Sequence, residues 1–309
     1  RRVLFRSMKI NLVCEGGGVR GIAHIGALCA LEDYGFTFNS FAGTSVGALI
    51  TSLMAVGYSA YEIKKILFDL DFSLYINKTV LASIPLLGKN LSLFKSKGIF
   101  STTAIEELLT KLYSVKGKKY FKDINKDINY IRFIATDITQ KQILILPEDL
   151  KKYNIDPLNF EISKAVKMSI SLPLIFIPEK IKTPKGSCYI VDGGLISNLP
   201  IWLFNSNTKY PTLALKLISN QDKNITYAEK CSLNKYLMDI IDACMAKNES
   251  IYFSSLNNIH TLELPTFDIA VTDFYISYSN KEKLFNSGYN TMTNFLKKNN
   301  ICSNINHLN

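Results

Sequence analysis

The sequence predicts an α/β domain built on a parallel sheet, because strand-like and helix-like segments alternate from its first structured residues. Residues 9–18, KINLVCEGGG, are a short apolar run ended by glycines, which is typical of a buried strand entering a tight loop. Apolar residues near helical spacing follow over 21–35 and stop at a glycine. Residues 36–45 then predict a second strand, and residues 46–57 predict a second, rather apolar helix.

The rest of the chain continues without a linker, an internal repeat or a low-complexity segment, so we expect a single domain over residues 8–309. Its motifs lie within 10–205, and residues 206–309 should complete the fold. Residues 1–7, RRVLFRS, precede Met8 and are interpreted as a leader remnant outside the fold. The further elements that we expect are helices at 102–113, 161–172, 233–256 and 279–299, and strands at 129–138, 141–147, 188–192, 210–218 and 259–265.

Composition narrows the class of protein and its partners. The 309 residues are 47% hydrophobic and 20% charged, as in globular proteins, and an aromatic content of 11% excludes a disordered chain. The formal net charge is +10, or 10 − 3 = +7 without the three arginines that precede Met8. This excess favours an anionic partner such as a phospholipid surface, with a basic solubilising surface as the alternative. The lysines occur singly or in pairs rather than in blocks, so we do not expect nucleic-acid binding.

The six cysteines show no CxxC pair and no regular spacing, so the sequence indicates neither a metal site nor a disulfide framework, and no cofactor is expected. Cys14 and Cys29 lie in apolar runs and are interpreted as buried, reduced thiols. No apolar run reaches the roughly 18 residues that span a bilayer. We therefore predict a cytoplasmic protein that could also contact a membrane peripherally.

Residues 43–47, Gly-Thr-Ser-Val-Gly, match the G-x-S-x-G pattern of a nucleophile elbow between a strand and a helix. Gly43 and Gly47 would permit the sharp turn, and Ser45 would stand at a helix N-terminus, where unpaired N–H groups favour negative charge. The competing interpretation is an ordinary serine N-cap. The strand-like and helix-like flanks favour Ser45 as a nucleophile.

A second motif, GGGVRG at residues 16–21, also lies between a strand and a helix. It matches the dinucleotide fingerprint, so a nucleotide-binding regulator is one alternative function. That function requires an acidic residue at the end of the second strand, whereas this strand ends at Ser45, and Glu32 and Asp33 fall earlier. The glycines could instead present backbone N–H groups to an oxyanion.

The nucleophile also needs a base, and the chain has only three histidines, His24, His260 and His307. Asp192, in VDGGL, follows an apolar strand whose end could lie at the same sheet edge as Ser45. A carboxylate must be partly desolvated to serve as a base, since its reference pKa is about 3.9. A Ser45–Asp192–His260 triad of a general serine esterase remains an alternative, because its chain order is that of α/β-hydrolases.

Three segments taken together, EGGGVRGIAHIGAL, FAGTSVGAL and YIVDGGLISNLP, resemble the patatin-like phospholipase family of bacterial type in order and spacing. FIATDI and AVKMSISLPLIFIP resemble further family segments, and the resemblance covers about residues 10–205. It implies a three-layer α/β/α sandwich with a mostly parallel sheet. It also implies a lipid acyl hydrolase of the phospholipase A or lysophospholipase type, which cleaves carboxylic esters through an acyl-enzyme without a metal.

Carried over position by position, the resemblance makes Ser45 the nucleophile and Asp192 the base of a Ser–Asp dyad without histidine. The backbone of the glycine loop would form the oxyanion hole, with Arg20 bracing the loop or the substrate phosphate; the three loop positions are Gly16, Gly17 and Gly18. Glu15 departs from the family pattern, in which aspartate commonly precedes the glycines. The implied substrate is a phospholipid or another acyl-ester lipid.

Residues 72–100 interrupt the alternation of strands and helices. The segment is apolar, contains Pro85, and carries four lysines, Lys78, Lys89, Lys95 and Lys97. Such a composition suits contact with anionic headgroups, so we expect a lipid-facing cap, with internal packing helices as the alternative.

Overall fold

The computed structural model describes residues 8–75, 77–78, 95–124, 126–204, 209–219, 236, 239–240, 243–244 and 258–299. The expected leader at 1–7 lies outside the described residues. So do most of the expected helix at 233–256 and most of the expected cap at 72–100, including Lys89.

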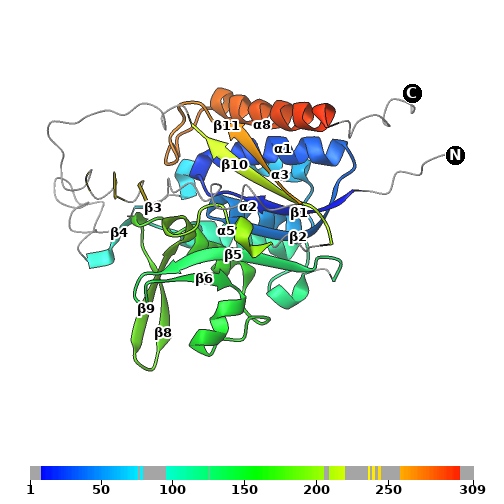
Figure 1. Ribbon diagram of the computed structural model, residues 1–309. Helices are drawn as coiled ribbons and strands as arrows, with labels where there is room; N and C mark the ends of the chain where they lie inside the picture. The colour runs from blue at the N-terminus through cyan, green and yellow to red at the C-terminus, as the bar shows by residue number, and fades with distance from the viewer. Residues whose placement is uncertain are drawn as a thin grey trace.

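A mostly parallel sheet forms the centre of the molecule (Figure 1). In the described part of the chain it has eight strands, in the order β11-β10-β1-β2-β5-β9-β8, with β6 pairing β5. The strands β11, β10, β1, β2 and β5 run parallel, whereas β6 and β9 are antiparallel to β5, and β8 is antiparallel to β9. Their bounds are β1 Lys9–Cys14, β2 Thr37–Thr44, β5 Tyr130–Asp137, β6 Gln142–Leu146, β8 Glu179–Thr183, β9 Gly186–Asp192, β10 Thr212–Ile218 and β11 Ile259–Pro265.

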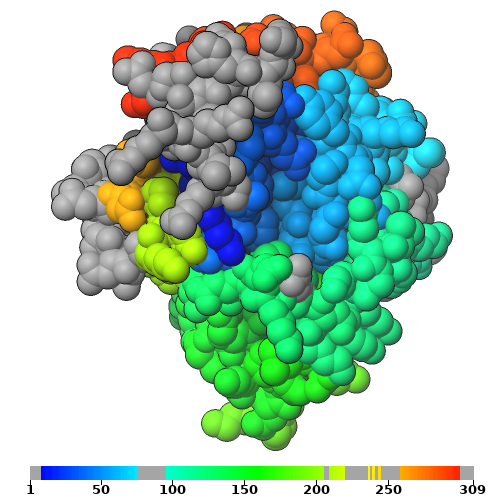
Figure 2. Space-filling model, turned by 90° about the vertical axis from the view of Figure 1, so that its right-hand side faces the viewer, coloured from blue at the N-terminus to red at the C-terminus, as the bar shows by residue number. Residues whose placement is uncertain are grey.

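Helices pack around this sheet, and Figure 2 shows the blue and cyan N-terminal residues lying directly against the green middle of the chain. The helices are α1 Ile22–Asp33, α2 Val46–Ala55, α3 Ala60–Asp69, α5 Thr103–Val115, α6 Ile162–Ser169 and α8 Tyr278–Lys298. A small second sheet contains β3 Asn77–Lys78, β4 Gly98–Ser101 and β7 Leu174–Phe176. Short 3-10 turns cover Gly18–Gly21, Phe72–Tyr75, Phe121–Asp123, Glu148–Tyr153, Gly193–Leu195 and Ile201–Leu203.

Alternate residues of the central strands enter two separate cores, because successive side chains of a strand point to opposite faces. In β1, Leu12 and Cys14 belong to the larger core, which also contains the buried faces of α1 and α2. Val13 lies on the other face, in a smaller core with Ala42 of β2 and Leu199. The sheet is therefore covered on both faces: the described helices pack into the larger core, and the segment that contains the 3-10 turn Ile201–Leu203 packs into the smaller one.

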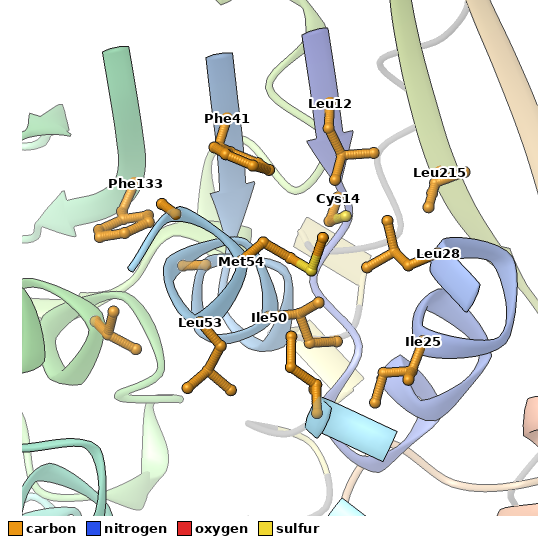
Figure 3. Packing of buried hydrophobic residues seen from close by; sticks show 14 of the residues in the cluster. Leu12, Cys14, Ile25, Leu28, Phe41, Ile50, Leu53, Met54, Phe133 and Leu215 are labelled. Carbon is orange, nitrogen blue, oxygen red and sulfur yellow. The ribbon is translucent and has the colours of Figure 1, made fainter. Parts of the chain in front are cut away.

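Figure 3 shows the larger core at close range. Leu12 and Phe41 point from the sheet toward Ile50 and Met54 of α2 and toward Leu28 of α1. Burying each such side chain fully stabilises the fold by on the order of 1.5–3 kcal/mol. This packing holds α2, the helix that begins after Ser45, against the middle of the sheet.

The longest described helix, α8, lies along α1 (Figure 1). The two helices approach closely at two glycines: a Cβ on Gly26 would overlap the Phe285 carbonyl, and a Cβ on Gly288 would overlap the Ala23 carbonyl. No described helix is both long and apolar enough to cross a membrane.

The first strands and helices, the β5–β6 pair, β10, β11, α5 and α8 agree with the sequence prediction. The predicted helix at 161–172 ends earlier, at Ser169. Helix α3 was missed, although its N-terminus has a capping box in which Ser59 and Glu62 bond each other's backbone N–H, a signal that the residues S-A-Y-E already carry.

Candidate active site

Ser45 occupies a sharp turn between the end of β2 and the start of α2. Its backbone angles, φ 54 and ψ −126, lie in a region that a residue with a side chain rarely adopts. Gly43 and Gly47 make the turn possible: a Cβ on Gly47 would overlap the Cys14 carbonyl, and one on Gly43 would overlap the backbone of Gly47. Strain of this kind costs on the order of 1–3 kcal/mol and persists where the surrounding structure enforces it.

The strained turn is held by hydrogen bonds from a segment far along the chain. Ser45 N donates to Ser169 Oγ at 3.0 Å, and Ser169 Oγ donates to the Ile134 carbonyl of β5 at 2.6 Å. Thr44 Oγ1 donates to the Ser197 carbonyl at 3.0 Å. Sequence reasoning did not assign Ser169 to the site, although it lies in the KMSISLP segment that resembles the family.

Asp192 ends β9 and is fully buried. Its backbone N donates to the Ser171 carbonyl at 2.9 Å, and its Oδ1 accepts a hydrogen bond from Gly194 N at 2.7 Å. Its Oδ2 has no partner in complete hydrogen-bonding geometry, but the Ser45 hydroxyl lies near enough to stabilise the carboxylate. Burial raises the pKa of Asp192 to about 7, against the smaller lowering effects of Ser45 and Gly194.

The register of the sheet explains how Ser45 and Asp192 meet across 147 positions of sequence. In β5, Ile134 pairs with Thr44 of β2, and the next residue, Ala135, pairs with Asp192. Asp192 therefore lies at the level of the serine turn. It reaches that level on a strand antiparallel to β5, a direction that the sequence pattern did not indicate.

The glycine loop follows β1 and lies beside Ser45. Gly16 N donates to the Asn198 carbonyl at 3.1 Å, and Arg20 N donates to the Gly17 carbonyl at 3.2 Å. Among the described residues, no hydrogen bond engages the N–H of Gly17 or Gly18. Of the three glycines expected to supply oxyanion donors, Gly16 thus already has a backbone partner.

Glu15, the departure from the family pattern, braces this loop. Its Oε2 accepts from Leu217 N at 2.5 Å, and its Oε1 accepts from Asn198 Nδ2 at 3.3 Å. Asn198 thereby holds Gly16 and Glu15 at once, through its carbonyl and its side chain. Sequence reasoning placed Asn198 only within the LISNLP motif and assigned it no contact.

Arg20 lies against the glycine loop. Its Nε is 3.7 Å from the point that a Cβ on Gly17 would occupy, so the guanidinium flanks the loop backbone. Its charge also contributes to lowering the pKa of His24. The structure thus places Arg20 beside the loop.

Two of the three histidines are described, and His24 is not placed to act as a base. It is fully buried in α1, its Nε2 bonds the Glu15 carbonyl at 3.0 Å, and burial lowers its pKa to about 4. His307 lies outside the described residues.

His260, the base of the alternative triad, is exposed on β11 at the edge of the sheet. It pairs with Leu213, which is level with Leu12 and then Phe41 in the next two strands. Three inter-strand spacings separate β11 from β2, a lateral distance of about 14 Å. Phe41 is four residues before Ser45, so this geometry does not support the triad.

The structure also offers no support for the dinucleotide alternative. The strand β2 ends at Thr44. The two acidic residues before it accept hydrogen bonds from the start of α3: Glu32 from Ala60 N, and Asp33 from the Tyr61 hydroxyl. Among the residues that the structure describes, no group of three or more His, Cys, Asp or Glu could hold a metal ion.

Ser45 opens into an apolar groove of about 140 Å³. The groove lies between α2, α3 and α5, and its residues other than the glycines and Ser45 are apolar except for Thr272. Helix α2 contributes Val46, Leu49 and Leu53 to the lining, and α5 contributes residues from Ile105 to Leu112.

A mostly parallel α/β sheet, a strained serine turn and an adjacent buried carboxylate are the features of a hydrolase-like site, and the comparisons agree with this class. The family model of patatin-like phospholipases matches residues 12–205, and the chain belongs to this family. The resemblance stated from the motifs is thereby confirmed.

The chain is also similar to individual proteins. The chain is 34% identical over 298 residues to the uncharacterized protein YqhO of Bacillus subtilis (strain 168), covering 94% of this chain and 99% of that protein. It is 31% identical over 192 residues to the probable lipid hydrolase 463L of Invertebrate iridescent virus 6, covering 62% of this chain and 61% of the viral protein.

Among solved structures, VipD from Legionella pneumophila has the same fold, with a TM-score of 0.58 at 17% identity. The match covers 94% of this chain and 67% of VipD. The sequence prediction of a patatin-like α/β fold is therefore confirmed.

Proposed function

We propose that the protein hydrolyses carboxylic ester bonds of acyl lipids, as a phospholipase A or lysophospholipase, through a dyad of Ser45 and Asp192. One observation carries the proposal: a fully buried carboxylate lies beside a strained serine at the end of an apolar groove. Family membership and a relative named as a probable lipid hydrolase point to the same substrate class.

In the proposed reaction, the Asp192 carboxylate accepts the hydroxyl proton as Ser45 Oγ attacks the acyl carbonyl. Burial makes this possible, because it brings the pKa of Asp192 to about 7, far closer to neutral pH than that of an exposed aspartate. The backbone of Gly194 engages only Oδ1 of the carboxylate, and the Ser45 hydroxyl lies close enough to this carboxylate to lower its pKa.

The tetrahedral oxyanion is proposed to bind the N–H groups of Gly17 and Gly18, which flank Ser45 in the groove lining. Val46 N, the first amide of α2, is a further donor, since the first N–H groups of a helix have no intrahelical partner. Losing one such donor costs on the order of 3 kcal/mol of transition-state stabilisation.

Collapse of this intermediate breaks the ester C–O bond, and the proton held by Asp192 passes to the departing alcohol. The acyl group then remains on Ser45 Oγ. A water molecule gives one proton to Asp192 as its oxygen attacks the acyl carbon. The bond between the acyl carbon and Ser45 Oγ then breaks, the proton passes from Asp192 to Oγ, and the fatty acid leaves.

The test is incubation with vesicles of mixed phospholipids, followed by mass spectrometry of the released fatty acids. The wild type should release them, whereas Ser45→Ala and Asp192→Asn should lower the rate by about 10³-fold or more. Ser114→Ala is the matched control, because Ser114 is an exposed serine of α5 that does not line the groove. Equal release by the wild type and Ser45→Ala would refute the proposal.

His260→Ala separates the dyad from the triad. The exposed position of His260 leads us to expect full activity in this variant. Loss of esterase activity with intact folding would contradict the dyad.

A further inference from the structure

The groove beside Ser45 has a defined direction, set by helix α2. Its lining residues on α2 are Val46, Leu49 and Leu53, which are three and four residues apart and therefore share one face. Leu53 is eight positions beyond Ser45, so the groove runs about 12 Å along the helix from the serine at 1.5 Å per residue.

Helix α5 forms a wall along the same path. Its residue Ile105 packs against the small cluster of Leu172 and Phe176. This cluster follows Ser169, whose hydroxyl accepts the hydrogen bond from Ser45 N, so this end of α5 lies toward the serine. Its last lining residue, Leu112, lies at the other end of α2. The spacing from Ile105 to Leu112 is about 10 Å by the same rise per residue, which is close to the length calculated along α2.

Beyond Leu53 and Leu112 the helices are tied together. The Tyr58 hydroxyl, just after α2, donates to the Leu112 carbonyl at 2.8 Å, and Ser52 Oγ bonds the Tyr113 hydroxyl at 2.6 Å. Both tyrosines are buried, at 7% and 1% exposure, and neither lines the groove.

An ion pair adds a third tie at this end, outside the two tyrosines. Lys116, the residue directly after α5, has its Nζ 2.9 Å from Oε1 of Glu62 of α3. The two hydrogen bonds and the ion pair hold α5 against α2 and α3 beyond the last lining residues, so the groove ends there.

We propose that this groove is a ruler for one acyl chain, closed near the tenth carbon, so that the site selects medium-chain acyl groups. The inference rests on the proposed ester hydrolysis at Ser45. An extended chain advances about 1.2 Å per bond, as three backbone bonds span about 3.6 Å, and a groove of about 12 Å thus holds about ten carbons. Leu53 and Leu112 at its end are the specificity-determining residues.

The first experiment measures kcat/KM for p-nitrophenyl esters with saturated acyl chains of four to sixteen carbons. Each methylene that enters the groove should raise kcat/KM about fourfold, the factor that corresponds to about 0.8 kcal/mol per buried methylene. We expect the rise to stop near ten carbons. A profile that is flat, or that keeps rising to sixteen carbons, would overturn the proposal.

Two variants move the closed end in opposite directions. Leu112→Phe fills it and should lower the ratio of kcat/KM for the ten-carbon and six-carbon esters by about tenfold or more, because two or three methylenes lose their site. Leu53→Ala opens it and should raise the ratio for the fourteen-carbon and ten-carbon esters.

Matched controls are Val115→Phe, which adds a ring at an exposed position of α5, and Leu28→Ala, which shortens a fully buried leucine of α1 outside the groove. Neither control should shift the profile. Leu112→Phe changes a half-buried side chain, so it keeps the test decisive if Leu53→Ala does not fold. Wild-type profiles in both groove variants would also overturn the proposal.

A binding measurement separates this inference from the proposed reaction. Calorimetry of the Ser45→Ala protein with fatty acids of six to sixteen carbons needs no catalysis. Affinity should rise about fourfold per methylene and level off near ten carbons. If the affinity levels off near ten carbons but the wild type hydrolyses no ester, the chain-length selection is upheld and the proposed reaction is refuted. If the wild type hydrolyses esters but the affinity does not depend on chain length, the reaction is upheld and the chain-length selection is refuted.

Discussion

Replacing Asp192 by Asn should make the folded protein more stable at pH 8 while it removes the proposed base. Asp192 is fully buried, and burial raises its pKa from 3.8 to about 7. Above pH 7 the folded protein therefore holds a carboxylate with little solvation. An asparagine has nearly the same shape, can still accept the hydrogen bond from Gly194 N, and carries no charge.

Proton linkage gives the direction in which the stability of the folded protein changes with pH. A carboxyl group whose pKa is raised on folding adds stability below pH 3.8, where it is protonated in both states, and this contribution is lost as the pH rises through about 7. The shift of 7 − 3.8 = 3.2 pKa units corresponds to roughly 4 kcal/mol at 1.36 kcal/mol per unit. Asp192→Asn removes this penalty.

The assay is urea unfolding of both proteins at pH 4, 6 and 8. With an m-value of about 3 kcal/mol/M, the midpoint of the variant should exceed that of the wild type by about 1 M at pH 8. The difference should shrink at pH 6 and nearly vanish at pH 4.

The control is the same substitution at a second buried aspartate. Asp137 accepts hydrogen bonds from Tyr153 Oη at 2.6 Å, Thr139 N at 2.8 Å and Gln140 N at 3.0 Å, so its carboxylate is well solvated by the protein. Asp137→Asn should destabilise by about 1–3 kcal/mol at pH 8, because an amide cannot accept at both positions. An Asp192→Asn variant that is less stable than the wild type at pH 8 would refute the reasoning.

Three further predictions follow from the serine turn. Ser45→Gly should raise the free energy of unfolding by about 1 kcal/mol in urea denaturation, since glycine accepts φ 54 without strain; a loss of stability would contradict the strain. Ser169→Ala should cost about 2 kcal/mol, measured the same way, because Ser45 N loses a buried partner; an unchanged midpoint would show that this bond contributes nothing. Gly47→Ala should lower the free energy of unfolding by about 3 kcal/mol, because the new Cβ would overlap the Cys14 carbonyl. Gly117→Ala should lower it by only about 1 kcal/mol, because Gly117 has open space around it and only its φ of 67 is unfavourable for alanine. Equal melting temperatures of the two alanine variants would contradict the close approach at Gly47.

The sequence by itself determined the local elements that carry chemistry. Glycines are needed at positions 43 and 47 because other backbone atoms lie so close that any side chain would overlap them. The sequence shows this requirement directly, because glycine is the residue type without a side chain. The alternation of apolar runs and glycine loops was sufficient to predict the parallel sheet, since strand and helix periodicities are local properties. The missed helix α3 also had a readable signal at Ser59 and Glu62.

Only the tertiary structure decided which distant residues contact these elements. The partners of Ser45 and Gly16 are Ser169 and Asn198, more than a hundred residues away, and no local pattern specifies which buried hydroxyl or carbonyl will lie there. The raised pKa of Asp192 is likewise a consequence of complete burial, which many distant side chains create together. Hydrogen-bond partners and desolvation are properties of packing, whereas turns and periodicity are properties of the chain.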